Sequence, residues 1–300
     1  MTATRTDAAP AVEQTIRKRP RWGRWVAAVL VLAVLAGLLA LLLASPNLEP
    51  GTIARYLFKP FVLQGVLVTL YLTAIAMVLG LAGGAVLAVM RLSPNPVLRG
   101  VSWLFVWVFR GTPLLVQIIF FGFLGALFPT ITLGIPFTDV TFFSQPTSTV
   151  ISGTTAAVLA LSLNEMAYAA EVVRGGILGV DPGQDEAARA IGMTPGMAMW
   201  RVVLPQAMRT IIPPMGNETI TMLKSTALVS VIAGRDLMTA VQTVYQQNYK
   251  VIPLLVVAAI WYLVLVSLLS VGQFFLERRF GRGHGSAARS ILGKLGGLRR

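Results

Sequence analysis

Long apolar stretches alternate with short polar segments along the whole chain. A membrane-spanning helix needs roughly 20 mostly apolar residues, and six stretches approach or exceed this length: residues 25–44, 61–90, 101–128, 149–168, 211–233 and 251–276. The third is interrupted by Arg110-Gly111-Thr112-Pro113, and the fifth contains Glu218 and Lys224. The pattern predicts an all-α polytopic membrane protein with about six transmembrane helices.

Composition supports the same class. Of 300 residues, 55% are hydrophobic and only 12% are charged, whereas soluble domains carry about 25% charged residues. Cysteine is absent, which excludes disulfides and thiol chemistry. The net charge of +13 would suit a nucleic-acid ligand, but many of the bases lie before the first apolar stretch or after the last one. We therefore expect basic tails at residues 1–24 and 278–300, and no nucleic-acid partner.

The basic residues also predict the orientation, because cytoplasmic loops of membrane proteins are enriched in Lys and Arg. Six spans place both tails on one side of the membrane, together with the Arg-bearing segments 91–99 and 174–209. The segment 128–145 falls on the other side and has no Lys or Arg. We expect a multi-pass protein of the cell membrane with both termini in the cytoplasm.

The first apolar stretch allows two interpretations. It is either an additional transmembrane helix over residues 25–45 or a signal peptide that is cleaved at "ALLLAS". The stretch is longer than the roughly 7–15 apolar residues of a signal peptide, which favours the retained helix. In the second stretch, Gly80 and Gly84 form a GxxxG pattern, which predicts close packing against another helix.

A polar segment, "DPGQDEAARAIGMTPG" at residues 181–196, interrupts the apolar chain. Asp181 followed by Pro182 is an N-cap before a proline at the first helical position. Gln184 stands where the second member of a capping box would be. Gly192 is expected to end this helix in a left-handed conformation.

Thr194-Pro195 repeats the start signal, and Pro205 is expected to stop the second helix. The pattern predicts a helical hairpin with about ten residues per arm. Three apolar residues share one face of the second arm through their i, i+3, i+7 spacing: Met197, Trp200 and Leu204.

The first arm has an unusual surface for docking. Its small side chains let a partner helix or groove approach closely, with Ile191 as one apolar anchor. The alternative is a helix that lies on lipid headgroups, but such helices are usually Lys-rich with bulky apolar faces, and this arm has neither feature. The small residues are Ala187, Ala188 and Ala190, and the polar ones around them are Asp185, Glu186 and Arg189.

The order Glu186-Ala187-Ala188, Gly192 and Leu204-Pro205 resembles the EAA loop of permease subunits of binding-protein-dependent ABC importers. Four sequence segments around it are similar to motifs of the polar amino acid branch of that family and occur in the same order: "LQGVLVTLYLT", "RGTPLLVQ", "AYAAEVVRGGI" and "LKSTALVSVI". The resemblance covers residues 61–277. It implies a five-helix permease core over this range, preceded by the additional helix, with a cytoplasmic coupling hairpin.

The resemblance also implies partners and a function. Such a chain moves a polar amino acid into the cell by alternating access, with a cytoplasmic ATP-binding ABC subunit, an extracytoplasmic amino-acid-binding protein and a second permease chain, identical or different. The residues implied to couple to the ATPase are Gln184, Asp185, Glu186, Ala187, Ala188, Arg189, Ile191, Gly192, Leu204 and Pro205. The chain contains no GxxxxGK[ST] phosphate loop, so ATP hydrolysis is expected on the partner and not here. No cofactor or metal is expected.

Charged residues within the apolar stretches mark a candidate substrate path. An ionised group inside the hydrocarbon costs about 2.5–3.5 kcal/mol on insertion scales, so such groups usually face a cavity or a partner. The expected path, which could solvate a zwitterion, is Arg110, Thr112, Gln117, Asn164, Glu165, Tyr168, Asn217, Lys224 and Ser225.

Structural roles are open for several of these charges. Arg110 could serve only to hold backbone carbonyls at a helix break. Glu218 could lie at the interface with Lys224 extending its ammonium group toward water. Glu171 and Arg174, three residues apart, are expected to form an ordinary pair on a helix surface.

Two other functions compete with this interpretation. An ion-driven secondary transporter of a small polar metabolite often shows inverted repeats, and this chain shows no convincing repeat. An intramembrane enzyme is disfavoured because the chain has no HExxH or GxSxG, and its single histidine, His284, lies in the basic tail. The sequence does not distinguish acidic, amidic and basic amino acids as substrates.

Overall fold

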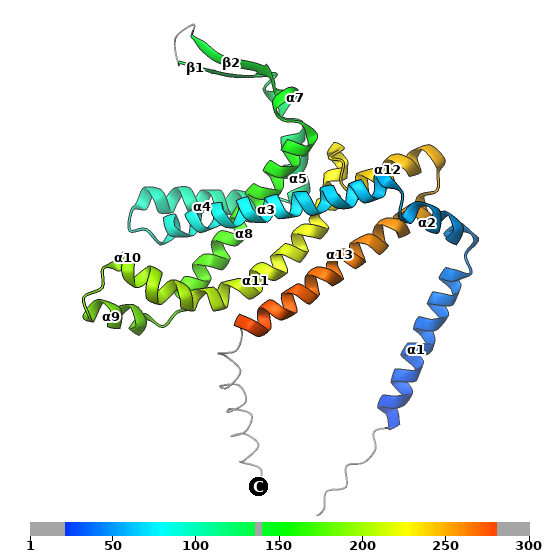
Figure 1. Cartoon of the computed structure of the whole chain (residues 1–300), viewed down its shortest axis with the longest axis horizontal. Helices are drawn as coiled ribbons and strands as arrows, with labels where there is room; N and C mark the ends of the chain where they lie inside the picture. Colours follow the sequence, from blue (N-terminus) through cyan, green and yellow to red (C-terminus); the bar gives the residue numbers. More distant parts are fainter. Residues whose placement is uncertain (1–21, 136–139, 281–300) are drawn as a thin grey trace, which may run out of the picture. The chain divides into compact units, whose positions relative to one another are not determined.

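The computed structural model describes residues 22–135 and 140–280 (Figure 1). The expected basic tails, apart from a few residues at their inner ends, and His284 lie outside these residues. The chain divides into two units, Met1–Leu48 and Glu49–Arg300. Each unit has its own arrangement of elements.

In the first unit, α1 (Trp22–Leu43) is followed by the short 3-10 turn η1 (Pro46–Leu48). The α1 sequence is almost uniformly apolar, and large side chains such as Leu32 and Leu41 are exposed. A helix that is hydrophobic all round needs an apolar environment on all sides. The helix covers most of the expected range, and its role as an additional transmembrane helix stays a prediction.

The second unit is built mainly from helices. Its elements are α2 (Pro50–Leu57), α3 (Pro60–Leu92), α4 (Pro96–Gly111), α5 (Leu114–Gly122), α6 (Leu124–Leu127), β1 (Thr130–Gly134), β2 (Thr141–Pro146), α7 (Thr147–Val150), α8 (Gly153–Leu178), α9 (Pro182–Ala190), α10 (Pro195–Ala198), the π-helical turn η2 (Met199–Val203), α11 (Leu204–Ser225), the 3-10 segment η3 (Thr226–Ile232), α12 (Leu237–Asn248) and α13 (Val251–Phe280).

Three described helices, α3, α8 and α13, are long and apolar enough to cross a membrane alone. The number rises to as many as six if each bent pair of helices counts as one span. One such pair is α4 with α5, whose axes differ by 99°. The break expected at residues 110–113 is therefore confirmed, and it is a sharp bend.

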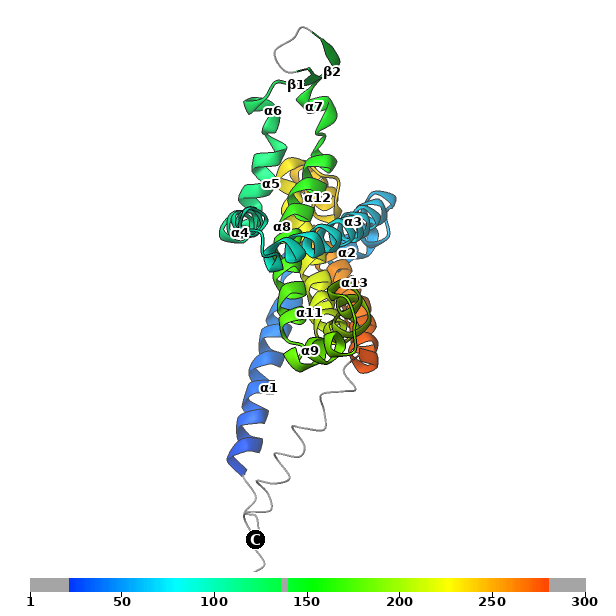
Figure 2. The ribbon, with the colours of Figure 1, turned by 90° about the vertical axis from the view of Figure 1, so that its left-hand side faces the viewer.

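The centre of the second unit is α8, which packs between α3, α4 and α11 (Figures 1 and 2). The expected close packing at Gly80 and Gly84 is confirmed. A Cβ atom at Gly80 would lie 2.3 Å from the Cγ of Glu165, and one at Gly84 would lie 2.6 Å from the Cβ of Ala169. Glycine at both positions lets the α3 backbone approach α8 closely.

A second core joins α3, α11, α12 and α13 through buried aliphatic side chains such as Val62, Leu223 and Leu254. Short α2 is tied to α13 at its end, where Trp261 Nε1 donates a hydrogen bond of 2.8 Å to the carbonyl of Leu57. Glu49, just before α2, accepts from the ammonium group of Lys250. These two contacts hold the two ends of α2 against α13 and against Lys250, the residue before it.

Strands β1 and β2 pair as an antiparallel hairpin in a region that was expected only as an external loop. All described strand residues are exposed except Ile131, which is half-buried. The hairpin is anchored at its base by buried Thr147, whose backbone N–H donates to the carbonyl of Pro129 at 3.0 Å and whose hydroxyl donates to that of Phe128. Threonine alternating with Ile and Leu in β1 favours a strand, so the signal was present in the sequence.

The expectation that Pro205 ends the second arm of the polar hairpin is wrong. Helix α10 has only four residues, and the chain continues through the π-helical turn η2 into α11, which begins at Leu204. Proline is tolerated in the first turn of a helix because its missing N–H has no intrahelical acceptor there. The second arm therefore continues directly into the fifth apolar stretch.

Candidate functional site

Both helix starts in the polar hairpin are capped as the sequence predicts. The backbone N–H of Gly183 donates to Asp181 Oδ1 at 2.8 Å, and that of Met197 donates to Thr194 Oγ1 at 3.4 Å. Gly192 has a φ of +87°, so the left-handed end of α9 is confirmed. These local interactions set the angle at which α9 leaves the end of α8 and returns through α10.

The prediction of a capping box at Gln184 is wrong. Instead of returning to Asp181, the Gln184 side chain accepts a hydrogen bond of 3.1 Å from Gln206 Nε2, near the start of α11. Gln206 Nε2 also donates to the carbonyl of Val202 at 3.0 Å. The glutamine pair therefore links α9 to the helix that runs into the membrane-spanning part of the molecule.

The exposed surface of α9 combines one apolar residue with paired charges. Ile191 is 76% exposed, although a side chain of this kind is usually buried. Arg189 and Asp185 form an ion pair of 2.8 Å on the helix surface. Ala187 is exposed as expected, but Ala188 is buried against the chain itself, so only part of the alanine cluster is open to a partner.

The α4–α5 bend is held by a small amide network. Gln117 Nε2 donates to the carbonyl of Phe109 at 2.9 Å and to Thr112 Oγ1 at 2.8 Å. Asn164 Nδ2 donates to the same carbonyl at 3.0 Å and to Gln117 Oε1 at 3.1 Å. These bonds satisfy the last turn of α4 where its regular hydrogen bonds stop. Three of the expected path residues are thus brought together as a brace for the bend.

Glu165 lies next to this network on α8 and is 2% exposed. Its side chain packs against Gly80 of α3. Its Oε1 is buried and has no hydrogen-bond partner among the described residues. A buried acceptor without a donor is costly, which makes Glu165 the expected path residue with most to gain from an added ligand.

The expected path residues on α11 form a separate exposed face. Asn217 and Lys224 are exposed at i and i+7, with Thr221 between them. Ser225 Oγ donates to the carbonyl of Thr221 at 3.0 Å, which is a local bond within the helix. No direct bond joins this face to Gln117, Asn164 or Glu165 in the described part of the chain.

Arg110 and Tyr168 belong together but lie outside the amide network. The Arg110 guanidinium carbon stands 5.0 Å from the centre of the Tyr168 ring, which is a cation–π contact. Further along α8, the expected pair is confirmed, with Arg174 Nη2 2.7 Å from Glu171 Oε2.

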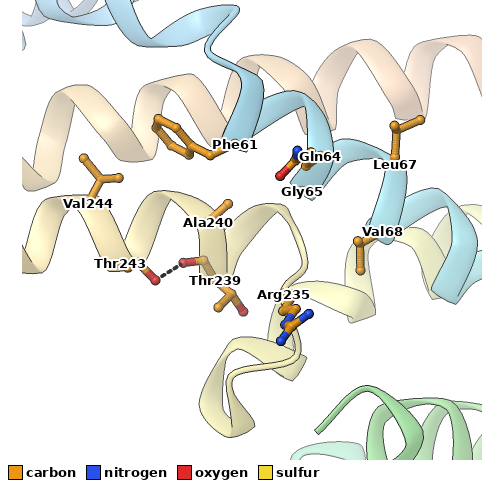
Figure 3. Close-up of a pocket in the computed structure, with 10 residues that line it drawn as sticks. All are labelled: Phe61, Gln64, Gly65, Leu67, Val68, Arg235, Thr239, Ala240, Thr243 and Val244. Atoms are coloured by element: carbon orange, nitrogen blue, oxygen red, sulfur yellow. Dashed lines mark hydrogen bonds between the residues drawn. The ribbon is translucent and has the colours of Figure 1, made fainter.

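A cavity of about 580 Å³ lies elsewhere, between the start of α3 and α12 (Figure 3). It is lined mainly by apolar atoms of residues such as Phe61, Leu67 and Val244, with Gln64 and Arg235 as polar groups. None of the expected path residues lines it. This cavity and the buried polar groups of the expected path therefore mark two different places in the molecule.

Comparison with known proteins supplies the family. Residues 76–282 match the family described as "Binding-protein-dependent transport system inner membrane component". The chain is 45% identical over 262 residues to the arginine transport system permease protein ArgU of Corynebacterium glutamicum, covering 87% of this chain and 81% of that protein. The chain belongs to this family.

Two further matches support the assignment of this chain to the family. The chain is 35% identical over 234 residues to the L-cystine transport system permease protein TcyB of Bacillus subtilis, covering 78% of this chain and 92% of that protein. A solved structure described as an amino acid ABC transporter with histidines matches with a TM-score of 0.62 and 38% identity, covering 74% of this chain and 95% of that one.

Family membership settles several points. The chain is a multi-pass inner-membrane component of an ABC importer and not an enzyme, since ATP hydrolysis belongs to a separate subunit of such systems. An ion-driven secondary transporter receives no support from these relatives. The fold expectation of a helical ABC importer permease is confirmed.

The sequence did not indicate a shared cavity for three further residues, Arg91, Trp103 and Trp107. They line a cavity with Arg110, Tyr168 and Glu171. The signal was available, because Trp103 and Trp107 are four residues apart and share one helix face. What the sequence did not show is that the end of α3 meets this face.

Proposed function

We propose that this permease subunit carries a polar amino acid into the cell, with both termini and the α9–α10 hairpin in the cytoplasm. The distribution of Lys and Arg supports this orientation. The named substrates of the relatives, arginine and L-cystine, support the substrate class. Both carry an α-ammonium and an α-carboxylate group, so the path needs partners for each charge.

The exposed α9 surface is the observation that carries the proposed coupling role. Ile191 projects from a short capped helix, and Gly192 turns the chain immediately after it. We assign ATPase coupling to this surface and the start of α11: Gln184, Asp185, Glu186, Ala187, Ala188, Arg189, Ile191, Gly192, Leu204 and Pro205. Because the hairpin continues directly into α11, movement of the ATPase would be passed to a helix in the membrane.

The substrate path is proposed along three groups. The brace of Thr112, Gln117 and Asn164 shapes the α4–α5 bend, and Glu165 beside it offers a free acceptor to an ammonium group. Arg110 with Tyr168 offers a cation to a carboxylate. The α11 face consists of exposed Asn217 and Lys224 with half-buried Ser225, and we propose that a second permease chain, identical or different, closes the path over it.

In this proposal, the extracytoplasmic binding protein delivers the amino acid, and closure of two ATPase subunits shifts the permeases between outward-open and inward-open states. The shift requires that the partner bind one state more tightly than the other. The first test is uptake into vesicles that contain the permease and binding protein, with and without the ATPase subunit. Uptake driven by an ion gradient without the ATPase would contradict the proposal.

The second test is Glu165→Gln, which removes a charge and keeps the side-chain shape. We expect initial uptake per complex to fall at least tenfold while the yield of intact complex stays normal, because an ammonium–carboxylate contact in a low-dielectric site is strong. Glu277→Gln is the matched control, since it removes an exposed carboxylate near the end of α13. Unchanged uptake per complex in Glu165→Gln would remove this residue from the path.

A further inference from the structure

A second cavity, of about 480 Å³, lies where the end of α3 meets α4 and α8. Its lining includes Arg91 from α3, Trp103, Trp107 and Arg110 from α4, and Glu171 from α8. We propose that this cavity binds the phosphate of an anionic phospholipid headgroup from the cytoplasmic leaflet. The leaflet rests on the orientation proposed above, whereas the cavity and its chemistry do not.

The first argument is a buried donor without an acceptor. The Nη1 atom of Arg91 is buried and has no hydrogen-bond partner among the described residues. Arg110 contacts the face of Tyr168, but no hydrogen bond or ion pair joins its guanidinium group to the residues that the structure describes. A guanidinium group presents several N–H donors in a plane and matches the oxygens of a phosphate. Two such groups in one cavity therefore call for an anion.

The second argument is the state of the acidic residue in the lining. Glu171 interacts electrostatically with Arg91 and Arg110, but its Oε2 accepts from Arg174 at 2.7 and 3.0 Å. The carboxylate is thus already engaged by a third guanidinium group. The Arg91 end of the cavity thus offers a guanidinium group whose neighbouring acid is already paired with Arg174, so a phosphate diester suits this end.

The third argument is the pair of tryptophans. The rings of Trp103 and Trp107 are stacked with centroids 6.0 Å apart and planes within 10°, and both side chains are more than half exposed. Tryptophan is enriched at the level of lipid headgroups. Arg91 lies in the last turn of α3, and Glu171 lies about two turns before the end of α8, so the cavity is near one end of the spans. Basic pockets between helices on the cytoplasmic side suit anionic headgroups.

Arg91 carries the test, because Arg110 also belongs to the proposed substrate path. The intact importer complex would be placed in nanodiscs of phosphatidylcholine with or without phosphatidylglycerol, and retained lipid would be counted by native mass spectrometry. We expect wild-type complex to retain phosphatidylglycerol selectively. Arg91→Gln should weaken this retention roughly tenfold, the effect of losing charge-assisted hydrogen bonds.

Arg99→Gln is the matched control, because Arg99 is exposed near the start of α4 and does not line the cavity. It should retain phosphatidylglycerol like the wild type. Equal loss in Arg91→Gln and Arg99→Gln would overturn the proposal in favour of general surface charge. If Arg91→Gln does not assemble, Trp103→Ala keeps every charge and should still reduce retention, and full retention in that variant would overturn the site.

Inorganic phosphate separates the two sources of the same chemistry. At millimolar concentration it should not displace phosphatidylglycerol. If inorganic phosphate binds and the complex retains no phosphatidylglycerol selectively, the site is one for the free ion and the lipid assignment is overturned. A crosslink from Trp103→Cys to a second permease chain, with no retained lipid, would overturn it in favour of a subunit contact. Glu165→Gln should lower uptake with the lipid count unchanged, so failure of either proposal can be recognised separately.

Discussion

Two hairpins project from opposite ends of the second unit, one helical and one made of strands (Figures 1 and 2). The α9–α10 hairpin buries Ala188 and Ala198, is linked to α11 by the Gln184–Gln206 bond and continues directly into that helix. The β-hairpin has no buried residue in its described strands and is held at its base by Thr147. In the proposed coupling role, the first hairpin would pass movement to α11, whereas the described part of the second is bonded to the rest of the unit only at its base.

The way in which each hairpin is attached limits what it can do. A surface loop that shares hydrogen bonds and buried residues with a membrane-spanning helix is expected to move together with that helix. An isolated two-stranded hairpin is marginally stable and can be altered with little effect on the rest of the fold. Changes in the two hairpins should therefore have very different consequences for assembly and transport.

The largest expected effect comes from Gly192→Val. Valine at a φ of +87° costs on the order of 1–3 kcal/mol, so the turn after Ile191 should be displaced. We expect uptake and co-purification of the ATPase subunit to fall together by tenfold or more, with normal membrane insertion.

Gly196→Val is the matched control for this turn. A Cβ atom added to either glycine would meet no other heavy atom within 4 Å, but Gly196 does not have a positive φ. The control should therefore retain most uptake. Equal losses in the two variants would show that side-chain bulk, and not the left-handed turn, is what the partner rejects.

An intermediate effect is expected from Gln206→Ala. This change removes the bond to Gln184 together with the local bond to the carbonyl of Val202, and one such hydrogen bond contributes about 0.5–1.5 kcal/mol. Transport per ATP hydrolysed should fall about two- to twelvefold, as an effect of that size implies, while the ATPase still binds. Gln273→Ala removes a comparable bond of 2.8 Å to Glu277 on α13 and should leave the ratio unchanged. A normal ratio in Gln206→Ala would mean that the link does not transmit movement.

The smallest effect is expected from replacing residues 131–145 with a short Gly/Ser linker. The paired ends, Thr130 and Pro146, lie within about 5.5 Å in an antiparallel ladder, so a short linker can join them. The replaced strand residues are exposed apart from half-buried Ile131, so their loss should remove few contacts with the helices. Thermal stability and ATPase co-purification should stay at the wild-type level, and a clear drop in either would show that the strands support the helices.

Much of the candidate site could be predicted because its signals are short-range. The caps at Asp181 and Thr194 and the left-handed Gly192 depend on nearby residues in the sequence, and all are confirmed. The capping box at Gln184 and the helix end at Pro205 were predicted wrongly because both depend on features that the neighbouring residues do not indicate. Gln184 bonds to a residue 22 positions away, and Pro205 is accommodated after a π-helical turn that no local pattern indicated.

The class of protein, the apolar stretches, the break at residues 110–113 and the polar hairpin follow from the amino-acid sequence alone. Hydrophobic length and local capping decide these features before any tertiary contact forms. The folded structure was needed to show that Asn164 braces Gln117, that Glu165 packs against Gly80 and that Arg91 shares a cavity with Arg110. These contacts join helices that are far apart in the chain, and their geometry depends on how closely small residues let those helices approach.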